Sequence, residues 1–96
     1  MDRDQIIVLL QQFKKQNQKK YNIMKLGFFG SAVRNDMGKE SDLDVVVMLE
    51  KQDLFNLIGI KQDLEDQLQI PIDIISYRDK MNTFLKDRID TEAIYV

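Results

Sequence analysis

The stretch that decides the fold is Phe28–Glu50, which reads FFGSAVRNDMGKESDLDVVVMLE. Its second half contains the apolar run Val-Val-Val-Met-Leu, which predicts a buried strand. Asp42 and Asp44 stand at the start of this strand, where a charge is costly to bury unless something binds it. The pair Gly30-Ser31 precedes them by a short distance. The pattern indicates a site in which carboxylates and a tight turn act together.

Apolar spacing on both sides of this stretch predicts alternating helices and strands. Helices are expected at 3–17, 53–69 and 79–92, and strands at 23–29, 42–49 and, opened by Pro71, 71–76. Ser31 is expected to cap a short helix that runs to about residue 35. In the last helix, Phe84, Leu85 and Ile89 are expected to face inward. This order predicts an α/β fold, residues 1–96 forming a single domain with helices packed on a small mixed sheet.

Composition restricts the classes of function. The 96 residues carry a net charge of −2, which gives no broad attraction to nucleic acid, so direct nucleic-acid binding is not expected. The chain has no Cys and no His, and acid–base or metal chemistry must therefore use carboxylates. No apolar run is long enough for a signal peptide or a membrane span, so a cytoplasmic location is expected.

The acidic residues predict a metal site. Side chains alternate along a strand, so Asp42 and Asp44 should point to the same face. Asp73 lies in the next predicted strand and completes a three-carboxylate cluster if that strand pairs beside the second. Oxygen ligands alone suit Mg²⁺ or Mn²⁺, and Mg²⁺ usually shares its ligand shell with substrate phosphates. The turn at Gly30-Ser31 could receive such phosphates.

Gly30-Ser31, followed after ten residues by Asp42-x-Asp44, resembles the G-S-x10-D-x-D motif of the DNA polymerase β-like nucleotidyltransferase superfamily. The short chain is similar to the minimal nucleotidyltransferase (MNT) group of that superfamily. The resemblance implies that Asp42 and Asp44 bind two metal ions, and that Asp73 binds the second ion and prepares the attacking hydroxyl. It also implies that Gly30 and Ser31 hold the β and γ phosphates of a nucleoside triphosphate.

The resemblance further implies an antitoxin that transfers AMP from ATP to a tyrosine of a HEPN-domain toxin. The loop around Met37 is a plausible surface for such a partner, and a homo-oligomer is possible. Two alternatives stay open on the sequence. One is a non-catalytic antitoxin that neutralises its partner by contact, and the other is nucleotidyl transfer to a small molecule.

One position departs from the pattern G-S-x-x-R-G of many relatives. Arg34 is kept, whereas Asn35 replaces the glycine. Asn tolerates left-handed backbone geometry better than most residues, so the turn is expected to form. Arg34 either contacts phosphate or pairs with Asp36, Glu40 or Asp42 and shapes the loop.

Overall fold

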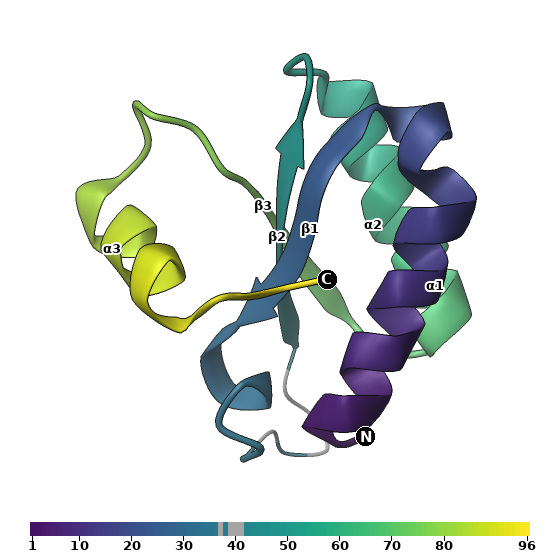
Figure 1. Cartoon of the computed structure of the whole chain (residues 1–96), viewed down its shortest axis with the longest axis vertical. Coiled ribbons are helices and arrows are strands. Elements are labelled where there is room, and N and C mark those ends of the chain that lie inside the picture. The colour runs from purple at the N-terminus through teal and green to yellow at the C-terminus, as the bar shows by residue number, and fades with distance from the viewer. Residues whose placement is uncertain (37, 39–41) are drawn as a thin grey trace.

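The structure, a computed structural model, describes residues 1–36, 38 and 42–96. Helices and strands alternate along the chain and build a layered α/β molecule (Figure 1). The elements are α1 (Arg3–Tyr21), β1 (Ile23–Phe29), the 3₁₀ turn η1 (Gly30–Ala32), β2 (Leu43–Leu49), α2 (Leu54–Leu68), β3 (Ile72–Ser76), α3 (Thr83–Glu92) and β4 (Ile94–Tyr95). The expected loop residues Met37, Lys39 and Glu40 lie outside the described part of the chain.

The sheet has the strand order β3-β2-β1-β4. Strand β1 pairs antiparallel with both β2 and β4, whereas β2 and β3 run parallel. A parallel pair needs a crossover connection, and α2 supplies it here. The expected class, a small mixed sheet covered by helices, is confirmed.

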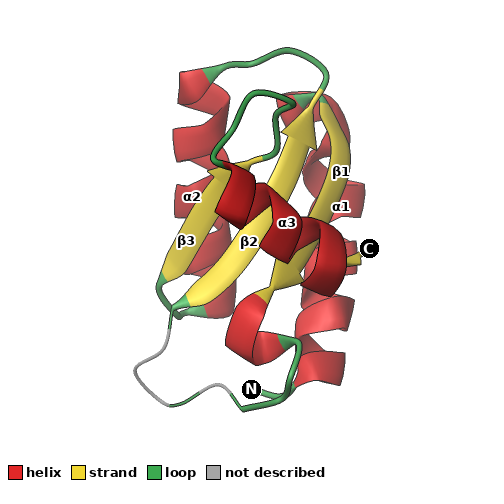
Figure 2. Ribbon diagram, turned by 90° about the vertical axis from the view of Figure 1, so that its left-hand side faces the viewer, coloured by secondary structure: helices red, strands yellow, loops and turns green. Residues whose placement is uncertain are grey.

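Helices α1 and α2 cover one face of the sheet, and α3 crosses the other face (Figure 2). The larger core lies under α1 and α2 and contains Leu43, Val45 and Val47 of β2. Val46 points the other way, into a smaller cluster under α3. Because side chains alternate along a strand, Asp44 lies on the α3 face.

The first helix is longer than expected. The polar run Gln18-Lys19-Lys20 after the expected end does not stop it, and α1 continues to Tyr21. Lys19 and Lys20 lie in its last turn, where positive charge interacts favourably with the helix dipole. Tyr21 is buried, and Asn22 ends the helix in the left-handed conformation, with φ of 56°.

Helix α2 lies within the expected range 53–69, and Asp53 caps its N-terminus by accepting hydrogen bonds from the backbone N–H groups of Phe55 and Asn56. Gly59 lies in the middle of this helix because Tyr21 of α1 packs against it. A Cβ atom at Gly59 would lie 2.9 Å from the Tyr21 hydroxyl oxygen. The close approach of the two helices therefore explains a residue that weakens helices elsewhere.

The C-terminal region differs from expectation in three respects. Helix α3 begins at Thr83 rather than 79, with Asn82 as its N-cap. Ile89 is buried as expected and Leu85 is half-buried, but the Phe84 side chain is 86% exposed, because it lies on the outer side of the helix. A short strand, β4, follows α3 and pairs with β1; no periodicity in two residues could have predicted it.

The turn after β1 also differs from expectation. Gly30, Ser31 and Ala32 form a single 3₁₀ turn, and Phe29 rather than Ser31 occupies its N-cap position. Ser31 is half-exposed within the turn, and its carbonyl accepts a hydrogen bond from the Asp36 N–H at 3.1 Å. Within the described ranges, no helix is both long and apolar enough to cross a membrane.

Candidate active site

The 3₁₀ turn brings Gly30 against the carboxylate of Asp44. Gly30 adopts φ of +80°, a region that side chains with a Cβ atom rarely adopt. A Cβ atom at this position would lie 2.6 Å from the Asp44 Oδ2 atom. Backbone conformation and close contact therefore both require glycine here, and the contact places the turn beside the first acidic strand.

Replacing Gly30 with Ala is expected to lower the free energy of unfolding by about 1–2 kcal/mol, because alanine resists the left-handed region. Chemical denaturation measures this loss. Asn35→Gly is the matched control, since Asn35 also has a positive φ, of 60°, and should change stability by less than about 1 kcal/mol. Equal stability of Gly30→Ala and the wild type would show that the turn is not constrained as described.

Asn35 confirms the expectation for the departure from the family pattern, because it adopts the left-handed conformation. Its side chain also makes a contact that glycine could not make. The Asn35 Oδ1 atom accepts a hydrogen bond from the Arg3 backbone N–H at 3.0 Å, and Arg3 Nη1 donates to the Val33 carbonyl at 3.1 Å. The turn is thereby tied to the start of α1.

Asp44 and Asp73 lie side by side. The parallel register of β2 and β3 pairs these two residues directly, and the charge of Asp73 acts on the Asp44 carboxyl. Asp44 is half-buried and Asp73 is exposed. The structure therefore brings together the two strand aspartates that the sequence analysis selected.

Burial raises the pKa of the Asp44 carboxyl above its ordinary value of 3.8, and the negative charge of Asp73 raises it further. Arg88 opposes this shift and lowers the pKa, while Asp42 adds a smaller increase. A bound cation would reduce the electrostatic repulsion between two carboxylates that lie together at a half-buried position. The electrostatics thus fit a divalent metal.

Asp42 is exposed and directly precedes β2. Its charge reaches Asp44, but among residues 1–36, 38 and 42–96 no three acidic side chains are arranged as a metal site. Mg²⁺ commonly takes one or two protein carboxylates and completes its shell with water and phosphate oxygens. The Asp44–Asp73 pair fits that ligand set, and a metal role for Asp42 stays a prediction.

Arg34 points toward the same region. Its guanidinium lies 3.5 Å from the Asp36 carboxylate and 3.7 Å from that of Glu92. Of the alternatives for Arg34, the pairing with Asp36 is present, whereas Glu40 lies outside the described residues and a phosphate contact stays a prediction. The Arg34 side chain is 54% exposed, so the guanidinium keeps room for a further anion.

Sequence reasoning missed two residues of α3. Arg88 Nη2 would lie 3.7 Å from a Cβ atom on Gly30, and the Glu92 carboxylate accepts a hydrogen bond from the Gly30 N–H at 3.2 Å. This amide was expected to face phosphate, and it is instead engaged by a side chain. The i, i+4 spacing places Arg88 and Glu92 on the same face of α3. No local sequence pattern indicates that the end of α3 packs over the turn.

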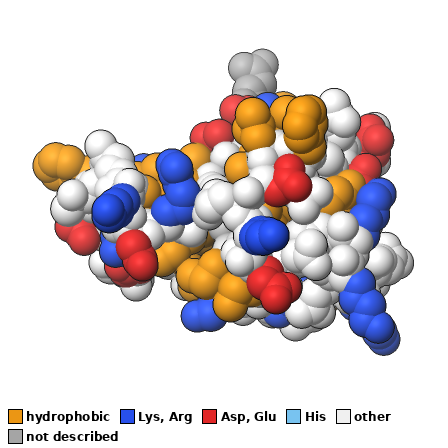
Figure 3. Space-filling model, turned by 90° about the horizontal axis from the view of Figure 1, so that it is seen from above, with side chains coloured by type: hydrophobic (Ala, Val, Ile, Leu, Met, Phe, Trp, Pro, Cys, Tyr) orange, Lys and Arg blue, Asp and Glu red, His pale blue; other side chains and the backbone are white. Residues whose placement is uncertain are grey.

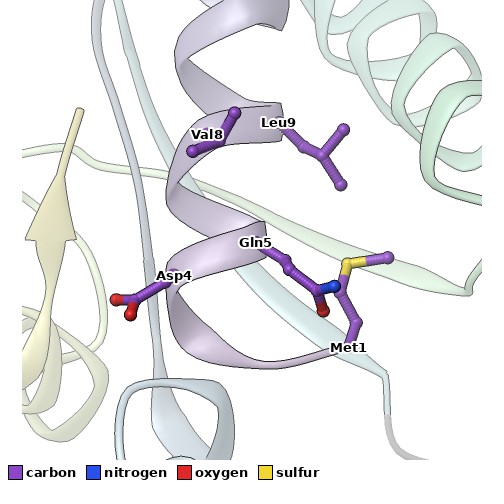
Figure 4. A pocket seen from close by; sticks show the side chains of 5 residues that line it. All are labelled: Met1, Asp4, Gln5, Val8 and Leu9. Carbon is purple, nitrogen blue, oxygen red and sulfur yellow. The ribbon is translucent and has the colours of Figure 1, made fainter.

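A surface hollow lies on the first turns of α1, far in the chain from the aspartates (Figure 4). It is lined by Met1, Asp4, Gln5, Val8 and Leu9. None of the residues selected for the site lines it. The hollow is therefore a feature separate from the acidic strands.

The family model for polymerase β-type nucleotidyltransferases, described as "Polymerase beta, Nucleotidyltransferase", matches residues 11–96. This chain belongs to that nucleotidyltransferase family. The motif-based resemblance and the expected enzyme class are therefore confirmed.

Relatives of this nucleotidyltransferase support the assignment over nearly its whole length. A protein of Methanocaldococcus jannaschii named "Putative protein adenylyltransferase MJ0126" is 32% identical over 92% of this chain and 91% of its own. A solved minimal nucleotidyltransferase superimposes with a TM-score of 0.80, at 26% identity, and covers 98% of this chain and 95% of that one.

More distant structures share the fold. An antitoxin of the MNT type, solved with a tri-AMPylated HEPN toxin of Shewanella oneidensis, matches with a TM-score of 0.61 at 20% identity, over 97% of this chain and 66% of that one. A toxin–antitoxin structure with the ATP analogue AMP-PNP matches with a TM-score of 0.71 at 19% identity, over 99% of this chain and 72% of that one.

Proposed function

We propose that this nucleotidyltransferase is a protein adenylyltransferase, which transfers AMP from ATP to a hydroxyl group, a tyrosine of a HEPN-type toxin, and so acts as an antitoxin. The observation that carries the proposal is the pairing of Asp44 and Asp73 beside the Gly30 turn. The relative named as a protein adenylyltransferase supports the acceptor class, and the folds solved in toxin–antitoxin structures support the partner.

The two strand aspartates would hold Mg²⁺ or Mn²⁺ together with the phosphates of ATP. The bound metal would supply charge stabilisation for the attacking and leaving oxygens of an in-line displacement. Asp73 is the exposed member of the pair and can take the proton of the attacking hydroxyl. Asp44, half-buried against the turn, fixes where the reacting phosphate lies relative to the backbone.

Arg34 and the Ser31 hydroxyl would bind the outer phosphates, which become the leaving group. In the reaction, the acceptor oxygen forms a bond to the α phosphorus, and the bond from the α phosphorus to the bridging oxygen breaks. Pyrophosphate leaves, and the hydroxyl proton passes to a carboxylate. Arg34 suits the pyrophosphate because a guanidinium binds phosphate oxygens through two parallel N–H groups.

The exposed surface of the molecule is also consistent with a protein partner. The end of the molecule opposite the turn carries apolar side chains among charged ones (Figure 3), and in α2 the exposed apolar residues include Leu54 and Phe55. Phe84 of α3 is exposed as well. A chain of 96 residues that presents such side chains can recruit its acceptor as a separate protein.

The test is to incubate the purified protein with ATP labelled on the α phosphate, Mg²⁺ and a HEPN-domain toxin. Label should appear on the HEPN protein, and mass spectrometry should locate one or more AMP groups on tyrosine. ATP labelled on the γ phosphate is the control and should leave no label. Toxin neutralisation that persists without any transfer would favour the non-catalytic antitoxin instead.

A further inference from the structure

The carboxylate of Glu92 is shared by three groups. It accepts a hydrogen bond from the Gly30 N–H at 3.2 Å, and it lies 3.7 Å from a guanidinium nitrogen of Arg34 and 3.7 Å from one of Arg88. Two guanidinium groups of like charge are thus held next to each other by one carboxylate. The arrangement connects the end of α3 to the turn after β1.

The position of Glu92 in its helix is unfavourable for a negative charge. Glu92 is the last residue of α3, where the helix dipole disfavours a negative charge. Its side chain is only 29% exposed, so solvent screens the carboxylate incompletely. The cost of this position is offset by the two arginines and by the N–H group of Gly30, which is a buried residue whose amide needs an acceptor.

Arg88 faces Asp44 as well as Glu92. Its positive charge acts on Asp44 and lowers the pKa of that carboxyl. Its guanidinium carbon lies 5.6 Å from the centre of the Phe29 ring, which supports the group from one side. The side chain is 52% exposed, and a guanidinium carries five N–H donors, so donors remain for another ligand.

We propose that Arg88 binds the triphosphate of the nucleotide beside Arg34, and that Glu92 is the positioning residue that holds the two guanidinium groups at the turn. This inference rests on the function proposed above. A metal-bound triphosphate has a cationic and an anionic part. The site offers a matching pair of surfaces, with Asp44 and Asp73 next to the two arginines.

The first test is the affinity for ATP with Mg²⁺, measured by calorimetry without any acceptor. Arg88→Met keeps the side-chain stem over Phe29 and removes the charge, and it should weaken ATP binding about 10-fold or more. Affinity for AMP, which lacks the β and γ phosphates, should change less than about 3-fold. Arg88→Lys keeps the positive charge but loses the planar guanidinium group. The ATP affinity of this variant should lie between those of Arg88→Met and the wild type.

Arg78→Ala is the matched control. Arg78 is exposed and follows the far end of β3, about 16 Å along the chain from Asp73 at roughly 3.3 Å per residue. This variant removes the same charge from the chain, yet should leave ATP affinity within about 2-fold of the wild type. A similar loss in Arg78→Ala and Arg88→Met would show an effect of net charge alone, which would overturn the inference.

The positioning role of Glu92 is tested with Glu92→Gln, which keeps an acceptor for the Gly30 N–H but loses the attraction for the arginines. The KM for ATP should rise several-fold while kcat at saturating ATP changes little. Combining it with Arg88→Met should weaken ATP binding by less than the product of the two single effects, because part of the Glu92 effect acts through Arg88. Fully multiplicative effects would contradict the positioning role.

Failure of this inference can be separated from failure of the proposed function. If the wild type binds ATP and transfers AMP but Arg88→Met and Arg88→Lys match it in ATP affinity, Arg88 is no phosphate ligand and the function stands. If the wild type neither binds ATP with Mg²⁺ nor transfers AMP, both proposals fail. Thermal melting of each variant identifies any that does not fold, and Arg88→Lys then decides the question.

Discussion

Asp44→Asn is expected to reduce AMP transfer by about 10³-fold or more while making the metal-free protein more stable at neutral pH. The loss of transfer follows because the amide cannot replace the carboxylate that faces both Asp73 and the Gly30 turn. The gain in stability follows because the same carboxylate is unfavourable in the folded protein before a metal binds. Function and stability therefore oppose each other at this residue.

The stability advantage of this variant depends on pH. The folded protein has a pKa for Asp44 above the ordinary 3.8, so it holds the proton of this carboxyl more tightly than the unfolded chain does. The resulting stability is fully present below pH 3.8 and is lost as the pH rises through the folded pKa. The asparagine amide of the variant carries no charge at any pH, so its advantage should appear above that range and vanish below pH 3.8.

Chemical denaturation in EDTA from about pH 3 to about pH 8 measures the difference in free energy of unfolding, and the transfer assay measures activity. Asp66→Asn is the matched control, because Asp66 is exposed on α2 away from the paired strands. It should alter neither quantity appreciably. Full transfer by Asp44→Asn would rule out the proposed role of this carboxylate, whatever its stability.

Removal of divalent metal is expected to abolish transfer and to reverse the stability order. Mg²⁺ with ATP at about 100 times the dissociation constant would stabilise the wild type by about 2.7 kcal/mol, which corresponds to roughly 10 °C in Tm for a domain of this size. Asp44→Asn and Asp73→Asn should show little of this increase. The wild type should therefore be more stable than Asp44→Asn with metal and nucleotide, and less stable than it without them.

Differential scanning fluorimetry with Mg²⁺ and ATP, with either alone, and with EDTA measures these shifts. Gln67→Glu adds an acidic side chain at an exposed position of α2 and serves as the control for nonspecific cation binding. An equal metal-dependent shift in the wild type and Asp44→Asn would mean that the cation binds elsewhere.

Local patterns were sufficient to place Asp44 and Asp73 on the strands where the structure has them. Alternation along β2 fixed the face of Asp44, and the apolar residues on both sides of Asp73 fixed its strand. Only the pairing of β2 with β3 was undetermined, and a sheet this small leaves few alternatives. The structure shows that these strands pair, with Asp44 opposite Asp73.

Arg34 was already a candidate from the motif, but Arg88 and Glu92 could not be predicted, because their position depends on where α3 packs. In the sequence, Arg88 and Glu92 look like ordinary charged residues of an amphipathic helix. They lie at the turn because β4, which follows α3, pairs with β1. Phe84 illustrates the same limit, since its apolar character suggested the core although the helix presents it to solvent. The positions of these side chains are decided by contacts between elements distant in sequence, and helix propensity carries no information about them.

The mixed sheet has a consequence for how catalysis is divided. Among the described strands, β3 has a neighbour on one side only, so exposed Asp73 borders open space. In the proposed transfer, a folded acceptor would approach along this flank. The same openness would let water reach the nucleotide until the acceptor arrives. One protein would thus supply the activated nucleotide, and the other would supply the dry chamber in which it reacts.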